Sequence, residues 1–200
     1  MSWLFGSRIF SSTTGPIVTV IEIFEKAALA AGRTILEVYE GGSNVRSKKD
    51  RTPVTEADTR AEEIILAILA KEMASFPVVA EEAVSAGRVP HTNDGSFILV
   101  DPLDGTKEFV DRRVEFTVNI ALIEAGAPVV GIVYAPAMAV AFTGSSKGAE
   151  KLTISADFTV AHRSPIHVRQ PPERLVAVAS RSHNNEETER FLKANQITEY

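Results

Sequence analysis

A chain of 200 residues with 44% hydrophobic residues and a net charge of −5 is expected to fold around a buried core. The acidic balance excludes a diffuse basic surface for nucleic acid polymers, and the absence of cysteine excludes disulfides, thiolate metal sites and thiol nucleophiles. No apolar run approaches the roughly 20 residues that span a bilayer, so we predict no transmembrane segment.

Two helices are predicted near the start of the chain. After an N-terminal extension over residues 1–15, Pro16 lies near the first turn of an amphipathic helix that ends at Gly41. A polar loop over residues 43–51 leads to a second helix, which begins near Thr55 and has a regular apolar face.

A mostly antiparallel sheet is predicted for the middle of the chain. Alternating apolar residues from Phe116 onward and a turn at Gly126 indicate a β-hairpin. Together with the other short apolar runs, strands are predicted over residues 76–80, 97–100, 116–122, 129–134, 140–143 and 152–154. The two helices and this sheet would form an α+β domain over residues 16–165.

The sequence pattern over residues 166–200 predicts the start of a second domain, of the α/β class. A short apolar strand is expected over residues 175–179, a polar-faced helix over 184–195, and a further strand beginning at Ile197. We expect the second domain to be truncated, since this pattern ends after one βα unit.

Three acidic clusters occupy positions where carboxylates could do chemistry. Asp58 opens the second helix, Glu81 and Glu82 follow one predicted strand, and Asp101 and Asp104 follow the next. Taken singly, they are explained by a helix-capping box, a solvated loop pair and turn-forming dipeptides. Taken together, they would repel one another unless a cation neutralises them. Oxygen ligands without Cys or His favour Mg²⁺, Mn²⁺ or Ca²⁺.

Gly105 and Thr106 follow the third cluster directly. Glycine permits the close approach of a phosphate to backbone amides, and the helix expected over residues 107–112 would point its N-terminus at that phosphate. The pattern therefore predicts carboxylates, a cation and an anion-binding turn in one place. No side chain in these clusters is an obvious nucleophile, which favours direct attack by water.

The stretch from Asp101 to Phe109, continuing through residues 115–123, resembles the signature of the inositol monophosphatase superfamily. Its Lys-Glu-Phe ending is similar to the 3'(2'),5'-bisphosphate nucleotidase branch. Four further motifs agree in order, over residues 53–58, 81–82, 134–136 and 180–183. The resemblance implies an α+β, layered α/β/α/β/α sugar-phosphatase-like fold with a largely complete first domain and a truncated second one.

The resemblance also implies a metal site. Its ligands would be Glu81, Asp101, Asp104 and the carbonyl of Leu103, which would bind two or three Mg²⁺ ions, with Mn²⁺ as a substitute. Glu82 is expected to lie outside the direct ligand set.

The remaining motif residues would act on water and substrate. By the resemblance, Asp58 and Thr106 would orient and deprotonate the attacking water. The amides of Gly105 and Thr106 would hold the phosphate, and Ser180 and His183 would contact the nucleotide.

The implied activity is lithium-sensitive, Mg²⁺-dependent hydrolysis of the 3'-phosphate of adenosine 3',5'-bisphosphate, a step of sulfur metabolism in the cytoplasm. Loose membrane association and a homodimer are compatible with it. Two alternatives remain: an inositol-phosphate or fructose-1,6-bisphosphate phosphatase, and an inactive metal- or phosphate-binding module. The last is kept because the superfamily's final metal ligand belongs to a Trp-Asp motif, and Trp3 is the only tryptophan.

Overall fold

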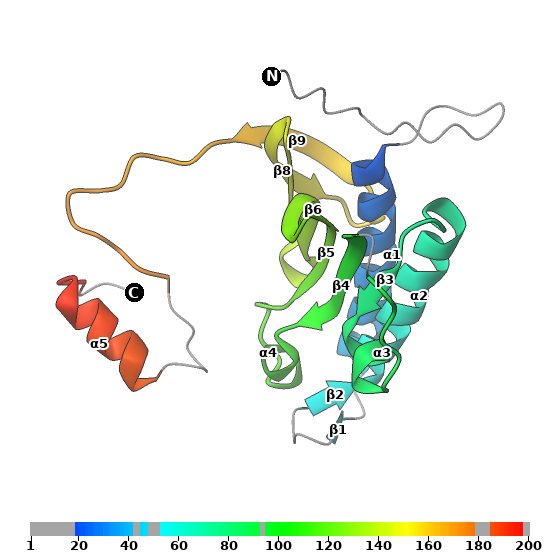
Figure 1. The fold of residues 1–200 in the computed structure, drawn as a ribbon. Coiled ribbons are helices and arrows are strands. Elements are labelled where there is room, and N and C mark those ends of the chain that lie inside the picture. Colours follow the sequence, from blue (N-terminus) through cyan, green and yellow to red (C-terminus); the bar gives the residue numbers. More distant parts are fainter. Residues whose placement is uncertain (1–18, 42–44, 48–52, 93–94, 179–184, 198–200) are drawn as a thin grey trace. The chain divides into compact units, whose positions relative to one another are not determined.

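The computed structural model describes residues 19–41, 45–47, 53–92, 95–178 and 185–197. It divides into two compact units, Met1–Ile166 and His167–Tyr200, which we call unit 1 and unit 2 (Figure 1). The extension predicted over residues 1–15 lies outside the described residues.

The helices of unit 1 lie mainly in its first half and most of its strands in its second half, and the described residues of unit 2 contain one further helix. The helices are α1 (Val20–Gly41), α2 (Glu56–Glu72), α3 (Glu81–Ser85), α4 (Thr106–Val110) and α5 (Glu186–Ala194), with a short 3₁₀ helix over Pro136–Met138. The strands are β1 (Val45–Ser47), β2 (Pro53–Thr55), β3 (Val78–Ala80), β4 (Ser96–Asp104), β5 (Thr117–Glu124), β6 (Ala127–Ala135), β7 (Val140–Ser145), β8 (Gly148–Ile154) and β9 (Val160–Ile166).

The main sheet of unit 1 has seven strands in the order β3-β4-β5-β6-β7-β8-β9. Only β3 and β4 run parallel, and every other neighbouring pair is antiparallel, so the predicted α+β class and mostly antiparallel sheet are confirmed. Strand β9 was not predicted, because His162, Arg163 and Ser164 at its centre are polar and its apolar residues do not alternate. A separate hairpin joins β1 to β2, where only a loop was expected.

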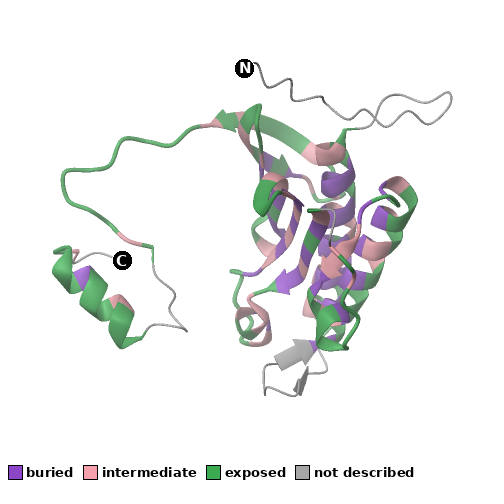
Figure 2. Ribbon diagram, viewed as in Figure 1, coloured by how far each residue is buried: buried purple, intermediate pink, exposed green. Residues whose placement is uncertain are grey.

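Helices α1 and α2 pack against each other and cover one face of the sheet (Figure 1). The buried residues of unit 1 concentrate between these helices and the central strands (Figure 2). Along β4, Ile98 and Val100 are buried while Leu99 is 45% exposed, because successive side chains of a strand point to opposite faces. The spacing of apolar residues along each helix and strand therefore determines which of its faces packs into the core.

Helix α1 lies unusually close to β6. A Cβ atom added to Gly32 would be 2.2 Å from Cε1 of Tyr134, whose ring is almost fully buried. Glycine thus lets the helix approach the sheet at this point. On the same helix, the buried Glu25 accepts hydrogen bonds of 2.8 and 2.6 Å from Nη1 and Nη2 of Arg163 on β9. The edge strand is therefore tied to the first helix.

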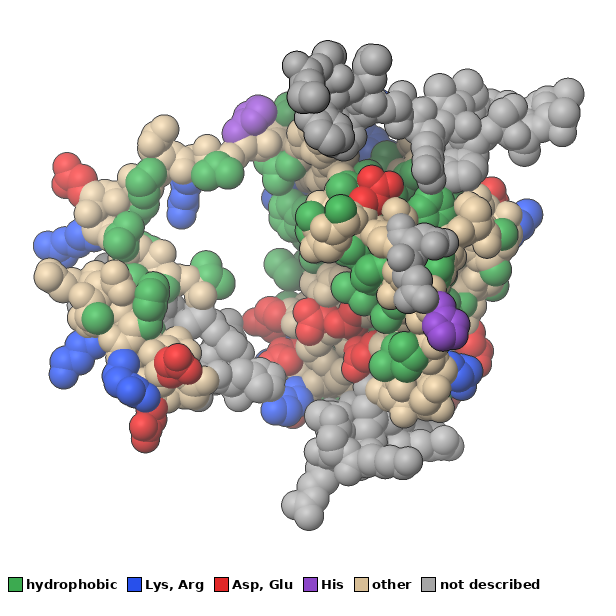
Figure 3. All heavy atoms as spheres, in the orientation of Figure 1, with side chains coloured by type: hydrophobic (Ala, Val, Ile, Leu, Met, Phe, Trp, Pro, Cys, Tyr) green, Lys and Arg blue, Asp and Glu red, His purple; other side chains and the backbone are tan. Residues whose placement is uncertain are grey.

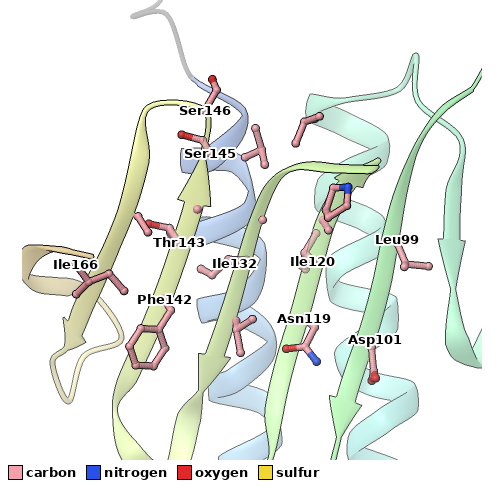
Figure 4. A pocket seen from close by; sticks show the side chains of 18 residues that line it. Leu99, Asp101, Asn119, Ile120, Ile132, Phe142, Thr143, Ser145, Ser146 and Ile166 are labelled. Carbon is pink, nitrogen blue, oxygen red and sulfur yellow. The ribbon is translucent and has the colours of Figure 1, made fainter. Parts of the chain in front are cut away.

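The other face of the sheet carries apolar side chains, among them Leu99, Val133 and Phe142, which are all more than a third exposed. A hollow of about 1050 Å³ lies over this face, and its lining side chains come mainly from β4, β5, β6 and β7 (Figure 4). Asp101 lies at one side of the hollow, where the apolar surface gives way to the acidic groups described below.

Unit 2 contains α5, whose N-cap Asn185 accepts a hydrogen bond from the backbone of Thr188 at 2.9 Å. The helix predicted over residues 184–195 is confirmed. The strand predicted over 175–179 is wrong, because residues 175–178 form no strand. An extended segment needs a partner strand for its backbone groups, and none of the described residues pairs with this segment. Among the described residues, no helix is long and apolar enough to cross a bilayer.

Candidate active site

A hydrogen-bonded group joins the start of α2 to the end of β4. The hydroxyl of Thr106 lies 3.2 Å from Oδ1 of Asp58 and 3.2 Å from the carbonyl oxygen of Leu103, and donates to these acceptors. The backbone N–H and hydroxyl of Thr55 donate to Oδ2 of Asp58, both at 2.7 Å. Both carboxylate oxygens of Asp58 are therefore engaged, and its orientation is defined from two sides.

Asp58 has two roles in this arrangement. It completes the predicted capping box of α2 with Thr55, which satisfies backbone N–H groups that the first helical turn leaves unpaired. It also reaches Thr106, 48 residues further along the chain. Burial raises the pKa of Asp58, although the hydrogen bonds from Thr55 and Thr106 oppose this shift. The structural and functional explanations of this residue are thus compatible.

Gly105 sits immediately before α4 with a φ of 89°, a left-handed backbone conformation that glycine adopts without a steric penalty. A Cβ at this position would lie 2.9 Å from the carbonyl oxygen of Glu115. The turn therefore requires glycine for both conformation and space. It brings the chain from β4 into α4, so that Thr106 is the first residue of that helix.

The aromatic ring of Phe109 on α4 packs against two others, from α1 and from the residue before β5. Tyr39, Phe109 and Phe116 lie with ring centroids 5.2 to 5.3 Å apart, each in contact with the other two. The guanidinium of Arg112 stacks 5.0 Å from the centroid of the Tyr39 ring and donates a hydrogen bond to the Tyr39 carbonyl. Rigid packing against a short helix keeps its first residue in place.

Asp101 is surrounded by negative charge. Burial first, then the carboxylates of Glu81 and Asp104 and a hydrogen bond with Glu81, together raise the pKa of this carboxyl to about 7. The N–H of Leu103 donates to Oδ1 of Asp101 at 3.2 Å and partly offsets the shift. Acidic side chains gather in one area of the visible face of unit 1 (Figure 3). Strand β3, α3 and β4 thus bring the second and third acidic clusters together.

The pairing of β4 with β5 explains how Asp101 and Asp104 come to the same site. Residues three apart in a regular strand point to opposite faces. Between these two residues the register shifts: Asp101 pairs with Asn119 but Asp104 pairs with Thr117, so β4 carries one extra residue. Pro102 lies in this irregular stretch, where its missing N–H costs no ladder hydrogen bond. The two aspartates therefore lie inside β4, and not after it as predicted.

Asn119 is a polar neighbour of the acidic group that was not predicted. Its side chain lies beside Asp101, on the adjacent strand (Figure 4), and its Nδ2 donates to Oδ2 of Asp104 at 3.4 Å. Its Oδ1 is buried and has no hydrogen-bond partner among the described residues. A buried acceptor without a partner calls for a water molecule or an ion. The available signal was its place on the strand predicted over residues 116–122, where it is a polar residue between the apolar Val118 and Ile120.

Glu62 is a second residue that the sequence reasoning missed. Its carboxylate is buried in α2 and accepts the backbone N–H groups of Glu82 at 2.7 Å and Ala83 at 2.8 Å. The signal was its spacing, since Asp58 and Glu62 are four residues apart and so share one face of α2.

The acidic group fits a hard divalent cation by the chemistry of its donors. Glu81, Asp101 and Asp104 offer carboxylate oxygens, and mutual repulsion of this kind is relieved by positive charge. Within the described residues, no three acidic, histidine or cysteine side chains already stand in a metal-binding arrangement. Closing the group around a cation would therefore need side-chain adjustment.

Most of the predicted site residues form two groups in the structure. The structure brings together Asp58, Leu103 and Thr106 by hydrogen bonds, and Asp101, Glu81 and Asp104 by proximity of charge. Ser180 and His183, which were predicted to contact the nucleotide, lie outside the described residues.

A family sequence model and individual relatives both identify the family of this chain. The sequence model of the inositol monophosphatase family matches residues 17–198. The 3'(2'),5'-bisphosphate nucleotidases CysQ of Salmonella typhimurium and Escherichia coli (strain K12) are each 41% identical over 165 residues, covering 82% of this chain and 64% of each relative. The chain thus spans less than two thirds of the length of these relatives.

Solved structures agree with the sequence matches. The crystal structure of CysQ from Bacteroides thetaiotaomicron has a TM-score of 0.66 and 35% identity, covering 86% of this chain and 66% of that chain. The extragenic suppressor protein suhB from Bartonella henselae has a TM-score of 0.58 and 31% identity, covering 68% and 55%. Since the family match extends over almost all of its length, the chain belongs to the inositol monophosphatase family.

Proposed function

We propose that this chain carries the catalytic half-site of a Mg²⁺-dependent phosphomonoesterase that removes the 3'-phosphate of adenosine 3',5'-bisphosphate, giving AMP and phosphate. The observation that carries the proposal is the junction of two groups at the end of β4: the Thr106–Asp58 hydrogen bond and the repelling carboxylates around Asp101. The Thr106–Asp58 pair can accept and transfer a proton, and the carboxylates around Asp101 can bind a cation.

Thr106 and Asp58 are suited to orienting a water molecule. Because the Thr106 hydroxyl donates its single proton toward Asp58 and Leu103, its oxygen keeps a lone pair to accept a hydrogen bond from water. Asp58 can take up the proton that the hydroxyl passes on, and burial assists by raising the pKa of Asp58. A covalent intermediate on the protein is not required.

The carboxylates of Glu81, Asp101 and Asp104, with the Leu103 carbonyl, would hold the Mg²⁺ ions. When bound, such ions lower the pKa of a bound water and neutralise charge on the phosphate. Glu82 would remain outside the direct ligands. The amides of Gly105 and Thr106 would contact the phosphate at the start of α4, where the left-handed Gly105 leaves the backbone uncovered by a side chain.

The choice of substrate rests on the relatives that are named bisphosphate nucleotidases. Ser180 and His183 would contact its nucleotide part. We further propose that unit 1 is the metal-binding domain of a layered α/β/α/β/α fold and that unit 2 begins its second domain. Inositol phosphates remain the second candidate substrate class, since the matching family model is that of the inositol monophosphatases.

Phosphate release tests the proposal. Adenosine 3',5'-bisphosphate, inositol 1-phosphate and fructose 1,6-bisphosphate are compared with Mg²⁺, with EDTA, and with Mg²⁺ plus Li⁺. We expect Mg²⁺-dependent, Li⁺-inhibited release from the nucleotide, and a loss of at least about 100-fold in Asp58→Asn. Glu63→Gln, an exposed carboxylate on the same helix, serves as the charge-matched control. Preference for either other substrate would reject the nucleotidase assignment.

A further inference from the structure

The carboxylate of Glu62 makes a two-pronged contact with another helix. Its Oε2 accepts the N–H of Glu82 at 2.7 Å and its Oε1 accepts the N–H of Ala83 at 2.8 Å. Only 3% of the residue is exposed. An anion is rarely buried this completely unless its oxygens are paired, and here both of them are.

The contact replaces a missing cap on α3. This helix has five residues, too few for stability on its own. Its N-cap residue, Ala80, has no side chain that could accept a hydrogen bond from the first turn. Glu62 supplies that acceptor from α2, and its negative charge suits the N-terminal end of a helix. Helix α3 packs beside α2 and β3 (Figure 1).

The first residue of α3 is Glu81. It directly follows Ala80, which pairs with Val100 in the parallel ladder of β3 and β4. Glu81 therefore comes beside Asp101, the next residue of β4. The rotation of α3 determines where the Glu81 carboxylate lies. Two hydrogen bonds to successive amides restrict both the position and the rotation of the first turn, whereas one would permit pivoting. The direction of the Glu81 side chain therefore depends on a residue that does not touch the acidic site itself.

Resting on the proposed function, we propose that Glu62 is a positioning residue of the metal site: it holds the first turn of α3 so that Glu81 stands opposite Asp101 as a cation ligand. Four residues before it on the same face of α2, Asp58 holds Thr106. One turn of α2 thus positions both the water-orienting hydroxyl and a ligand of the cation.

Metal binding without substrate tests this role. Mn²⁺ is titrated into the full chain at 10 °C, and free Mn²⁺ is followed by electron paramagnetic resonance. Glu62→Gln keeps the shape of the side chain but places an NH₂ group against one of the two N–H donors, and we expect about 10- to 100-fold weaker Mn²⁺ binding. Glu62→Asp keeps the charge but is one methylene shorter, so its affinity should fall between those of the parent and Glu62→Gln.

Two controls separate positioning from stability. Glu63→Gln makes the same charge change on the exposed side of α2. Ile154→Val removes a buried methylene on β8, which lies toward the opposite end of the sheet from β3, the strand that leads into α3. Both should bind Mn²⁺ like the parent. If Glu62→Gln also binds like the parent, or if Ile154→Val loses as much affinity, the inference is wrong while the proposed function stands. If the parent itself binds no Mn²⁺, both fall.

Discussion

Asp104→Asn measures the repulsion within the acidic site directly. In the folded chain the pKa of Asp101 is raised from 3.8 to about 7, by burial first and then by Glu81 and Asp104. Between these two pH values the folded chain keeps a proton that the unfolded chain releases. The metal-free chain therefore loses stability as the pH rises from about 4 to about 7, and above that the full penalty applies.

The size of the effect follows from the partial exposure of Asp101. A shift of this extent in a fully buried group would amount to several kcal/mol. Solvent screening reduces it here, and burial accounts for the largest part, so we expect removal of the Asp104 charge to recover about 1 kcal/mol at pH 8. For a chain of this length that corresponds to a Tm increase of about 2–4 °C.

The assay is thermal unfolding followed by circular dichroism, in EDTA and in Mg²⁺, at pH 8 and pH 5. Asp104→Asn should unfold at a higher temperature than the parent in EDTA at pH 8, and the difference should shrink at pH 5, where Asp101 is protonated in both. Mg²⁺ should raise the Tm of the parent more than that of the variant. A variant that is less stable in EDTA at pH 8, or equally shifted at both pH values, would refute the reasoning.

Three further substitutions test other parts of unit 1. Gly32→Ala should lower the free energy of unfolding by about 1–3 kcal/mol in urea titration through overpacking, whereas Gly41→Ala, with nothing within 4 Å of the added Cβ, should stay within about 1 kcal/mol of the parent. Thr106→Val should reduce phosphate release at least about 10-fold while Thr106→Ser keeps most of it, and equal losses would exclude a role for the hydroxyl. Arg163→Met leaves the buried Glu25 without its partner and should cost about 1–3 kcal/mol, which Glu25→Gln in the same chain should partly restore.

The periodicity of apolar residues in the sequence predicted the main helices and most strands of unit 1. Helices α1 and α2 have long regular apolar faces, and the hairpin of β5 and β6 has a clear alternation, so local pattern and tertiary packing agree. Helix α3 was not predicted, because five residues carry no period and its cap comes from another helix. The strand predicted from the apolar segment 175–178 was wrong for a different reason. Apolar residues predict burial, but a strand also requires a partner strand.

The acidic site shows where a pattern of residue types stops being informative. Asp-Pro-Leu-Asp suggested a turn after the strand, and spacing alone would have separated its two carboxylates onto opposite faces of a continuous strand. The irregular register between Asp101 and Asp104 resolves this conflict by adding one residue to β4 opposite β5. That irregularity depends on pairing with Asn119 and Thr117, which lie in a different part of the sequence. The ligand types were therefore readable from the sequence, whereas their convergence is a property of the sheet. By this reasoning a substitution that regularises β4 would scatter the site even if every carboxylate were kept.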